Sequence, residues 1–225
     1  MENIVINKIA HIETKFKEKF GIPRQSGRVK TLSGVIVFEK EFKNPDFFRG
    51  LENFSHLWII FGFDKARNKL PAPTVRPPRL GGNTRTGVFA TRSPYRPNNL
   101  GLTLAKIEQI DYEKCEIFVS GIDILNDSPV YDIKPYIPYA DYAPDAKGGF
   151  ADEFSDYKLT VEYDEKIFSG ICEADKETII ACIADDPRPA YKKDGDEVYK
   201  MKYGNLDVSF CVKDGIAKIT EIIVE

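Results

Sequence analysis

The sequence predicts a mainly β protein, in which a barrel or sandwich of strands precedes a small α+β domain. Six or seven strand-like apolar segments and few helical ones lie within roughly the first 135 residues. The stretch 139–156 has weak patterning and many turn residues. The remaining residues combine one helical segment with alternating strands. We therefore expect a barrel domain at 1–138, a linker at 139–156 and a small domain at 157–225.

Alternating or continuous apolar residues predict the strands of the N-terminal part. The segment 55–63 is the most apolar, and we expect it to be buried on both faces. His56, at its head, is more typical of a core histidine than of a catalyst. Residues 47–54 are expected to contain a helical turn that ends near Gly50. The other expected strands are 4–12, 32–38, 86–91, 100–111, 116–124 and 130–133.

Turn residues separate these strands. Glu113-Lys114 and the run Asn126-Asp127-Ser128-Pro129 are typical of tight turns. The segment 21–27 contains Pro23 and two glycines, so we expect no regular element there. It is either a plain connection or a shaped ligand loop.

The C-terminal part is expected to begin with a strand at 158–163. A helix is predicted at 176–184 with Asp175 as its N-cap, because a short polar side chain there can accept a hydrogen bond from the first turn. The proline-containing stretch 186–191 ends this helix. A meander of three strands is expected at 198–203, 208–212 and 216–224.

The composition excludes several classes of protein. The 225 residues include four cysteines without C-x-x-C spacing and two histidines, so we expect neither a disulfide framework nor a metal centre. No P-loop occurs, and no G-x-G-x-x-G motif follows a strand. No apolar run is long enough to span a bilayer, and the N-terminus lacks a signal-like pattern. We therefore expect a cytoplasmic protein with no membrane partner.

The basic segment, residues 76–98, is the most distinctive part of the chain. It has no acidic residue, and residues 65–107 carry nine basic side chains and no acid, although the whole chain has a net charge of −3. Such a local field favours an anionic partner, most commonly phosphate. A solvated surface loop is the alternative, but arginines interleaved with glycine, proline and Tyr95 favour a site. The arginines are Arg76, Arg79, Arg85, Arg92 and Arg96.

Motifs occur along the chain in a particular order. They are Pro23-Arg24-Gln25-Ser26-Gly27, Arg49-Gly50-Leu51, Phe54-Ser55-His56-Leu57-Trp58, residues 74–83, residues 87–93, Arg96-Pro97-Asn98, Asp132-Ile133-Lys134-Pro135-Tyr136 and Asp186-Pro187-Arg188-Pro189-Ala190-Tyr191.

Together these motifs resemble the TrmO-like family of β-barrel, S-adenosylmethionine-dependent tRNA (adenine-N6)-methyltransferases. The resemblance extends over nearly the whole chain, and many long motifs in one order make it specific. It implies a closed or nearly closed N-terminal β-barrel with a small α+β C-terminal domain. It also implies a homodimer that methylates the exocyclic amine of the adenosine just 3′ of the anticodon, after a threonylcarbamoyl group has been attached.

The resemblance implies that S-adenosyl-L-methionine binds against the barrel, near the subunit interface. Asp64 stands where it implies a ring-bearing or neutral residue, so we expect a backbone contact at that position. The implied cofactor-binding residues are Gln25, Ser26, Gly27, Asp64, Lys65, Arg92, Leu102, Asn126, Asp127, Ser128 and Pro129.

Given this resemblance, our hypothesis divides the remaining residues by role. Tyr95 would orient the acceptor, and the alternative for it is a packed aromatic ring. Arg188 would contact the anticodon loop by charge and Tyr191 by stacking; the alternatives are a helix C-cap contact and a core ring. With a pI of about 5.6, the protein must bind tRNA through a local patch. The arginines of the basic segment other than Arg92 would meet tRNA phosphates or the carboxylate of the threonylcarbamoyl group. The expected tRNA-binding residues are Arg76, Arg79, Arg85, Arg96, Arg188 and Tyr191.

Two other functions are compatible with these residues. One keeps the cofactor but changes the acceptor to another RNA or a small molecule. The other is a β-barrel module that binds S-adenosylmethionine or RNA without catalysis. The sequence identifies no general base for the proton on the acceptor nitrogen.

Overall fold

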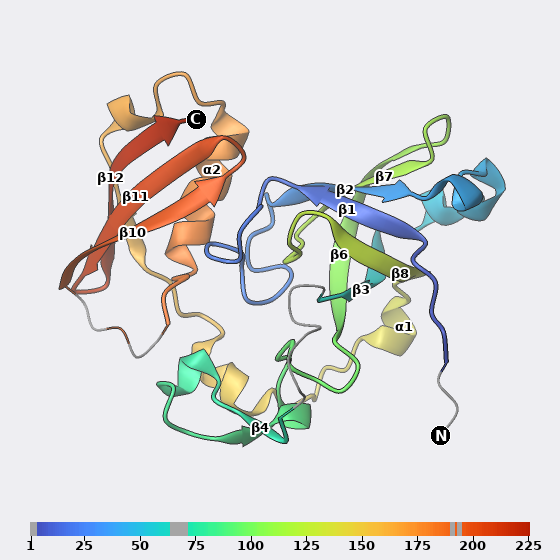
Figure 1. Ribbon diagram of the computed structural model, residues 1–225, viewed down its shortest axis with the longest axis horizontal. Coiled ribbons are helices and arrows are strands. Elements are labelled where there is room, and N and C mark those ends of the chain that lie inside the picture. The colour runs from blue at the N-terminus through green and yellow to red at the C-terminus, as the bar shows by residue number, and fades with distance from the viewer. Residues whose placement is uncertain (1–3, 64–71, 190–191, 193–194) are drawn as a thin grey trace.

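The computed structural model describes residues 4–63, 72–189, 192 and 195–225. Strands dominate these residues, and they form a closed barrel and a separate four-stranded sheet (Figure 1). The prediction of a mainly β protein with a closed barrel and a smaller C-terminal domain is therefore confirmed.

The barrel closes in the strand order β1-β2-β7-β6-β3-β8, and its neighbouring strands run antiparallel. Closure pairs both edges of each strand, so no edge is left to pair with another chain. The barrel strands are β1 (Ala10–Thr14), β2 (Ser33–Phe38), β3 (His56–Gly62), β6 (Leu100–Asp111), β7 (Glu116–Ser120) and β8 (Ser128–Pro135).

Alternating side chains of β3 fill the barrel interior. Leu57, Ile59 and Phe61 are buried, whereas Trp58 and Ile60 between them are half-buried. The prediction that this strand is buried on both faces is therefore wrong for its outer face. Strand residues point alternately to the two sides of a sheet, and the outer side of this barrel is covered only in part.

Several expected strands differ from the structure. Strand β8 begins at Ser128, so the predicted turn at 126–129 is wrong for its last two residues, which belong to the strand. The first expected strand begins at Ala10, and Ile4 is 88% exposed in an extended approach to it. Strand β7 ends at Ser120, because Gly121 adopts a positive φ of 73° that breaks the ladder. In place of a strand at 86–91, the two-residue β5 (Thr86–Gly87) pairs with β4 (Thr74–Val75), and Val88–Ala90 forms a 3-10 turn. The alternating apolar residues there do not form a longer strand, because the partner strand β4 has two residues.

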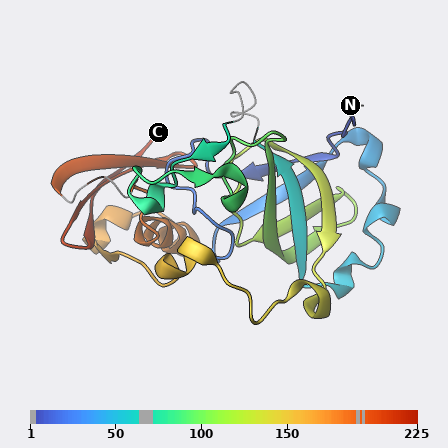
Figure 2. The same cartoon turned by 90° about the horizontal axis from the view of Figure 1, so that it is seen from below.

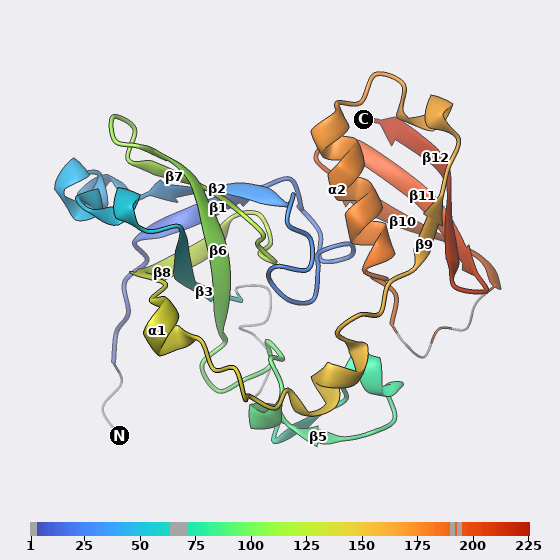
Figure 3. The ribbon, with the colours of Figure 1, turned by 180° about the vertical axis from the view of Figure 1, so that it is seen from behind.

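The C-terminal domain is a four-stranded sheet in the order β10-β11-β12-β9, with helix α2 (Glu173–Ala184) against one face (Figure 3). The helix begins earlier than predicted, and Cys172 rather than Asp175 is its N-cap. Asp175 instead lies in the first turn, where it pairs with Lys15 of the barrel domain at 2.6 Å. The strands are β9 (Thr160–Glu162), β10 (Gly195–Tyr203), β11 (Leu206–Lys213) and β12 (Ile216–Val224).

Short helical pieces connect these elements. Two 3-10 turns, Pro45–Phe48 and Leu51–Asn53, lie where a helical turn was expected. Helix α1 (Pro138–Asp141) follows the last barrel strand, and the 3-10 helix Gly149–Phe154 lies further along the same stretch.

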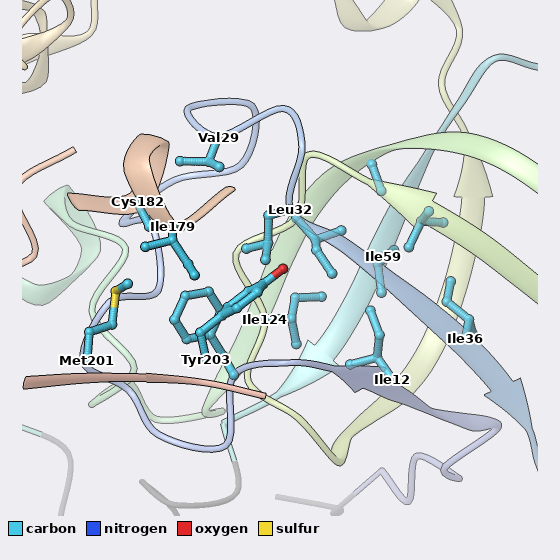
Figure 4. Close-up of a cluster of buried hydrophobic side chains, with 14 of the residues drawn as sticks. Ile12, Val29, Leu32, Ile36, Ile59, Ile124, Ile179, Cys182, Met201 and Tyr203 are labelled. Atoms are coloured by element: carbon cyan, nitrogen blue, oxygen red, sulfur yellow. The ribbon is translucent and has the colours of Figure 1, made fainter. Parts of the chain in front are cut away.

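One continuous core joins the two domains. Buried side chains from barrel strands and from α2, β10 and β11 belong to the same cluster (Figure 4). The loop after β1 makes the junction, where the rings of Phe16 and Tyr203 meet edge-on at 5.3 Å. Gly21 has a φ of 98°, and a Cβ there would lie 2.5 Å from Met201. This close approach requires glycine.

Arginines of the barrel domain also tie it to the end of α2. Arg28 donates its Nε to the carboxylate of Asp185 and its two Nη groups to the carbonyls of Ser155 and Tyr157, at 2.8 and 2.9 Å. The Arg24 guanidinium donates to the carbonyl of Arg188 at 2.6 Å. These bonds fix the C-terminal domain beside one end of the barrel.

We predict that Arg28→Ala destabilises the protein by about 3–5 kcal/mol, because the Asp185 carboxylate, 4% exposed, loses its charged partner. Urea unfolding followed by fluorescence measures the change. The double variant Arg28→Met/Asp185→Leu should recover most of the loss, since no charge is then left unpaired. A single variant as stable as the wild type would show that the pair does not hold the domains.

Candidate functional site

A cavity of about 1710 Å³ lies where the barrel end, the basic segment and the linker meet. Strands β3 and β6 form one wall through Phe61 and Leu102, and Phe154 of the linker faces them. The views of Figures 1 and 2 both place the segment that carries β4 beside the Gly149–Phe154 helix. The cavity therefore has a barrel wall, a basic rim and a linker wall.

Many of the residues predicted for a site come together here. Ser26 and Gly27 line a neighbouring cavity of about 390 Å³ instead. Arg85, Pro129 and Arg188 are described by the structure but line neither cavity. Asp64, Lys65 and Tyr191 lie outside the described residues. The predicted residues that line the larger cavity are Gln25, Arg76, Arg79, Arg92, Tyr95, Arg96, Leu102, Asn126, Asp127 and Ser128.

Arg92 and Gln25 connect the basic segment to the loop after β1. The guanidinium of Arg92 donates to Oε1 of Gln25 at 2.5 Å, although 67 residues separate them in the sequence. Leu102 lies on the barrel wall with 54% of its surface exposed. A charged group and an apolar wall thus face the same space, as is typical of a small-molecule site.

The turn that precedes β8 is held by hydrogen bonds to β1 and the loop after it. The amides of Asn126 and Asp127 donate to the carbonyls of Phe16 and Ile12 at 2.8 and 2.9 Å. Asp127 has a φ of 61°, a conformation that aspartate tolerates better than most residues. The turn therefore presents polar side chains to the cavity from a fixed backbone.

Two of the predicted tRNA-binding arginines are held inside the protein. Arg188 is 6% exposed, pairs with Asp186 at 2.8 Å and stacks over Tyr199. Arg79 donates to the carbonyl of Asp185 at 2.9 Å and lies over the Tyr157 ring at 5.1 Å. Arg79 therefore braces the junction between domains, whereas the Arg188 side chain bonds within the C-terminal domain and its carbonyl accepts from Arg24 of the barrel domain.

The other arginines of the basic segment face solvent or shape their own loop. Arg76 and Arg85 are exposed. Arg96 donates to the carbonyl of Thr91 at 2.5 Å and lies 5.8 Å from the ring centre of Phe89, which is 77% exposed. The rim of the cavity therefore combines positive charge with an accessible aromatic face.

Arg24 and Asp123 line the cavity, and the sequence did not single out either as a site residue. Burial lowers the pKa of Arg24, and the neighbouring Arg79 lowers it further. Burial raises the pKa of Asp123, against the opposing effects of the Thr103 hydroxyl, the charge of Arg92 and the Ser26 amide. Arg24 stood within a matched motif, whereas Asp123 is one acid at a strand end and carries no distinguishing sequence signal.

The described residues hold no group of three or more His, Cys, Asp or Glu side chains that could bind a metal ion. None of the helices in this part of the chain has the length and apolar character needed to cross a membrane.

Both domains match a known family. Residues 11–142 match the tRNA-methyltransferase O N-terminal domain, and residues 156–225 match the TrmO C-terminal domain. The chain belongs to the TrmO family.

Relatives extend this match over most of the chain. A tRNA (adenine(37)-N6)-methyltransferase of Escherichia coli is 38% identical over 208 residues, which cover 89% of this chain and 88% of that protein. The human tRNA (adenine(37)-N6)-methyltransferase is 42% identical over 159 residues, 70% of this chain but 34% of that protein. The crystal structure of TrmO from Pseudomonas aeruginosa matches with a TM-score of 0.80 and 29% identity, over 99% of this chain and 100% of that one.

We predict that Arg79→Ala loosens the basic segment. The variant loses a charge-assisted hydrogen bond and a cation–π contact, so amide hydrogens near β4 should exchange at least about tenfold faster. Hydrogen–deuterium exchange with mass spectrometry measures this, and Arg79→Lys should show a smaller increase. Arg49→Ala, at an exposed arginine paired with Asp46, serves as the control. Equal exchange in Arg79→Ala and the control would contradict the bracing role.

Proposed function

We propose that the protein is an S-adenosylmethionine-dependent tRNA methyltransferase that acts on N6 of the adenosine next to the anticodon. The acceptor nitrogen would carry a threonylcarbamoyl group. The observation that supports this most strongly is the arginine-rimmed cavity at the junction of the two domains that match the TrmO family. The curated relatives from E. coli and human are named for this activity at adenine 37.

The residues of the cavity fit S-adenosylmethionine. Arg24 lines the cavity, and its buried Nε has no hydrogen-bond partner among the described residues, so it offers a donor to a ligand carboxylate. Leu102 and Phe61 offer apolar surface to the adenine ring, and Asp123 offers a negative charge. When bound, the cofactor supplies a methyl group on a positively charged sulfur. The chain's task is then to orient the acceptor and exclude water.

As cofactor-binding residues we propose those members of the predicted set that line the large cavity. We also keep Ser26 and Gly27, which line the neighbouring cavity. Arg92 would hold the cofactor with Gln25, and the turn at 126–127 with the start of β8 would close its other side. Tyr95 lines the same cavity and would orient the acceptor base.

For the tRNA we propose contacts from exposed side chains of the basic segment, at the cavity rim and beyond it. Arg76 and Arg85 would meet backbone phosphates, and Phe89 offers a face on which an unpaired base can stack. Arg79 and Arg188 would act indirectly, since Arg79 holds the domain junction and Arg188 is paired with Asp186 inside the C-terminal domain. Arg96 would hold the backbone of its own loop in place, and so keep the rim in position.

We also propose a cytoplasmic homodimer, with the cofactor near the subunit interface, as in the family that the motifs resemble. The exposed Leu102 in the cavity, and the exposed Phe89 beside the cavity residue Arg96, support a further covering surface there.

The direct test is methyl transfer to RNA. The purified protein is mixed with S-adenosylmethionine that carries a tritiated methyl group and with total tRNA from a strain that lacks this gene. We expect label in tRNA, and in N6-methylated threonylcarbamoyl-adenosine after digestion to nucleosides. Cofactor binding without transfer would favour a binding module, and label in another nucleoside would refute the proposed acceptor.

We predict that Arg92→Ala weakens cofactor binding by about 10- to 150-fold, because a charged donor worth about 1.5–3 kcal/mol is lost from the cavity. Isothermal titration calorimetry measures the dissociation constant, with Arg49→Ala as an arginine control distant in sequence. An Arg92→Ala protein that binds the cofactor as tightly as the wild type would remove Arg92 from the cofactor site.

A further inference from the structure

Methylation of an N6 amine that carries a carbonyl group requires a proton acceptor. The nitrogen's lone pair is delocalised into the purine ring and the carbonyl, so it attacks a methyl group effectively only as its proton leaves. This requirement rests on the function proposed above. The question is which group of this chain can take that proton.

The charges around the large cavity leave few candidates. Its described lining includes eight lysines and arginines but two carboxylates, Asp123 and Asp127. His56 lines the smaller cavity instead. A cationic side chain does not accept a proton, so the two aspartates are the candidate bases in this lining.

The two carboxylates differ in their surroundings. Asp127 is exposed, and its Oδ2 accepts a hydrogen bond from the side-chain amide of Asn126 at 2.8 Å. Asp123 is half-buried and comes directly after the buried Ile122. Its Oδ1 accepts the hydrogen bond of the Thr103 hydroxyl, and Thr103 is 1% exposed on β6. The carboxyl group of Asp123 is therefore fixed in orientation by the barrel wall.

Asp123 also lies beside the residues assigned to the cofactor. The described groups that act on it are the Thr103 hydroxyl from β6, the Arg92 guanidinium from the basic segment and the Ser26 amide from the loop after β1. Arg92 in turn bonds Gln25. The carboxyl group therefore faces the same space as the cofactor-binding loop and Tyr95.

We propose that Asp123 is the proton acceptor for methyl transfer. The N6–H bond breaks and its proton passes to the Asp123 carboxylate, while the nitrogen lone pair forms the new bond to the methyl carbon. The electron pair of the S–CH₃ bond remains on sulfur, which becomes a neutral thioether. Asp123 releases the proton to solvent when the product leaves.

The local environment suits this role. Burial disfavours the charged carboxylate and raises its pKa, which makes it a stronger base than an exposed aspartate. The Thr103 hydroxyl and the Arg92 charge act in the opposite direction, and they keep the carboxylate form accessible. A base must be deprotonated to act, so activity should rise as the pH rises through this raised pKa.

Asp123→Asn tests the proposal, because it keeps the shape of the side chain and removes the base. We expect kcat for tRNA methylation to fall by a factor on the order of 10²–10⁴, with the dissociation constant of S-adenosylmethionine within about threefold of the wild type. Asp132→Asn, at a carboxylate of β8 paired with Lys134, should keep the wild-type kcat.

Thr103→Val provides a second test that does not depend on turnover. Loss of the hydroxyl removes a stabilising hydrogen bond from the carboxylate, so the pKa of Asp123 should rise. Carbon-13 NMR titration of the aspartate carboxyl groups, without cofactor, measures this shift. The acid limb of the kcat–pH profile should move to higher pH by the same amount.

Three outcomes would overturn the proposal while the proposed function stands, provided that the wild type labels tRNA. They are an Asp123→Asn enzyme with near-normal kcat, an Asp123→Asn enzyme that loses cofactor affinity rather than kcat, and an unchanged titration in Thr103→Val. A wild type that fails to label tRNA would instead refute the proposed function.

Discussion

Three guanidinium groups of the barrel domain hold the C-terminal domain against the barrel end, and the large cavity depends on them. Arg28 binds the Asp185 carboxylate, Arg24 the carbonyl of Arg188, and Arg79 the carbonyl of Asp185. Three arginines of the barrel domain thus donate charge-assisted hydrogen bonds to backbone carbonyls and one carboxylate at the end of α2. Without these bonds, neither the linker wall nor the basic rim would have a fixed place.

The positive charge of these arginines disfavours a positively charged cofactor in the same cavity. A sulfonium cofactor carries positive charge, and it would enter a cavity whose charged lining residues are mainly lysines and arginines. Hydrogen bonds to carbonyls of the C-terminal domain engage one Nη group each of Arg24 and Arg79, whereas the Nε of Arg24 has no partner among the described residues. Asp123 then supplies a negative charge beside the proposed cofactor loop. Rim arginines remain available for an anionic partner.

Much of the fold could be predicted from the sequence, because burial imposes a period of two on strands. Leu100–Asp111 and Ile216–Val224 have the predicted bounds for this reason. Residues 86–91 show similar alternation, yet a strand forms only where a partner exists, and β4 offers two residues. The N-cap of α2 is Cys172 rather than the predicted Asp175, which instead pairs with Lys15 across the two domains.

The site was harder to predict residue by residue. Clustered arginines indicated charge, but a sequence does not reveal which guanidinium groups are satisfied internally, as those of Arg79 and Arg188 are. Asp123 was missed because its burial and its bond to Thr103 arise only when two strands close the barrel. Family motifs located the cavity, whereas tertiary contacts decide the role of each side chain in it.

The most direct measurement is a crystal structure of the protein with S-adenosylhomocysteine, the demethylated cofactor. We expect its sulfur in the large cavity between Gln25 and Leu102, with the side that would bear the methyl group open toward Asp123 and Tyr95. A cofactor bound outside this cavity, or one whose adenine separates the sulfur from Asp123, would contradict the account.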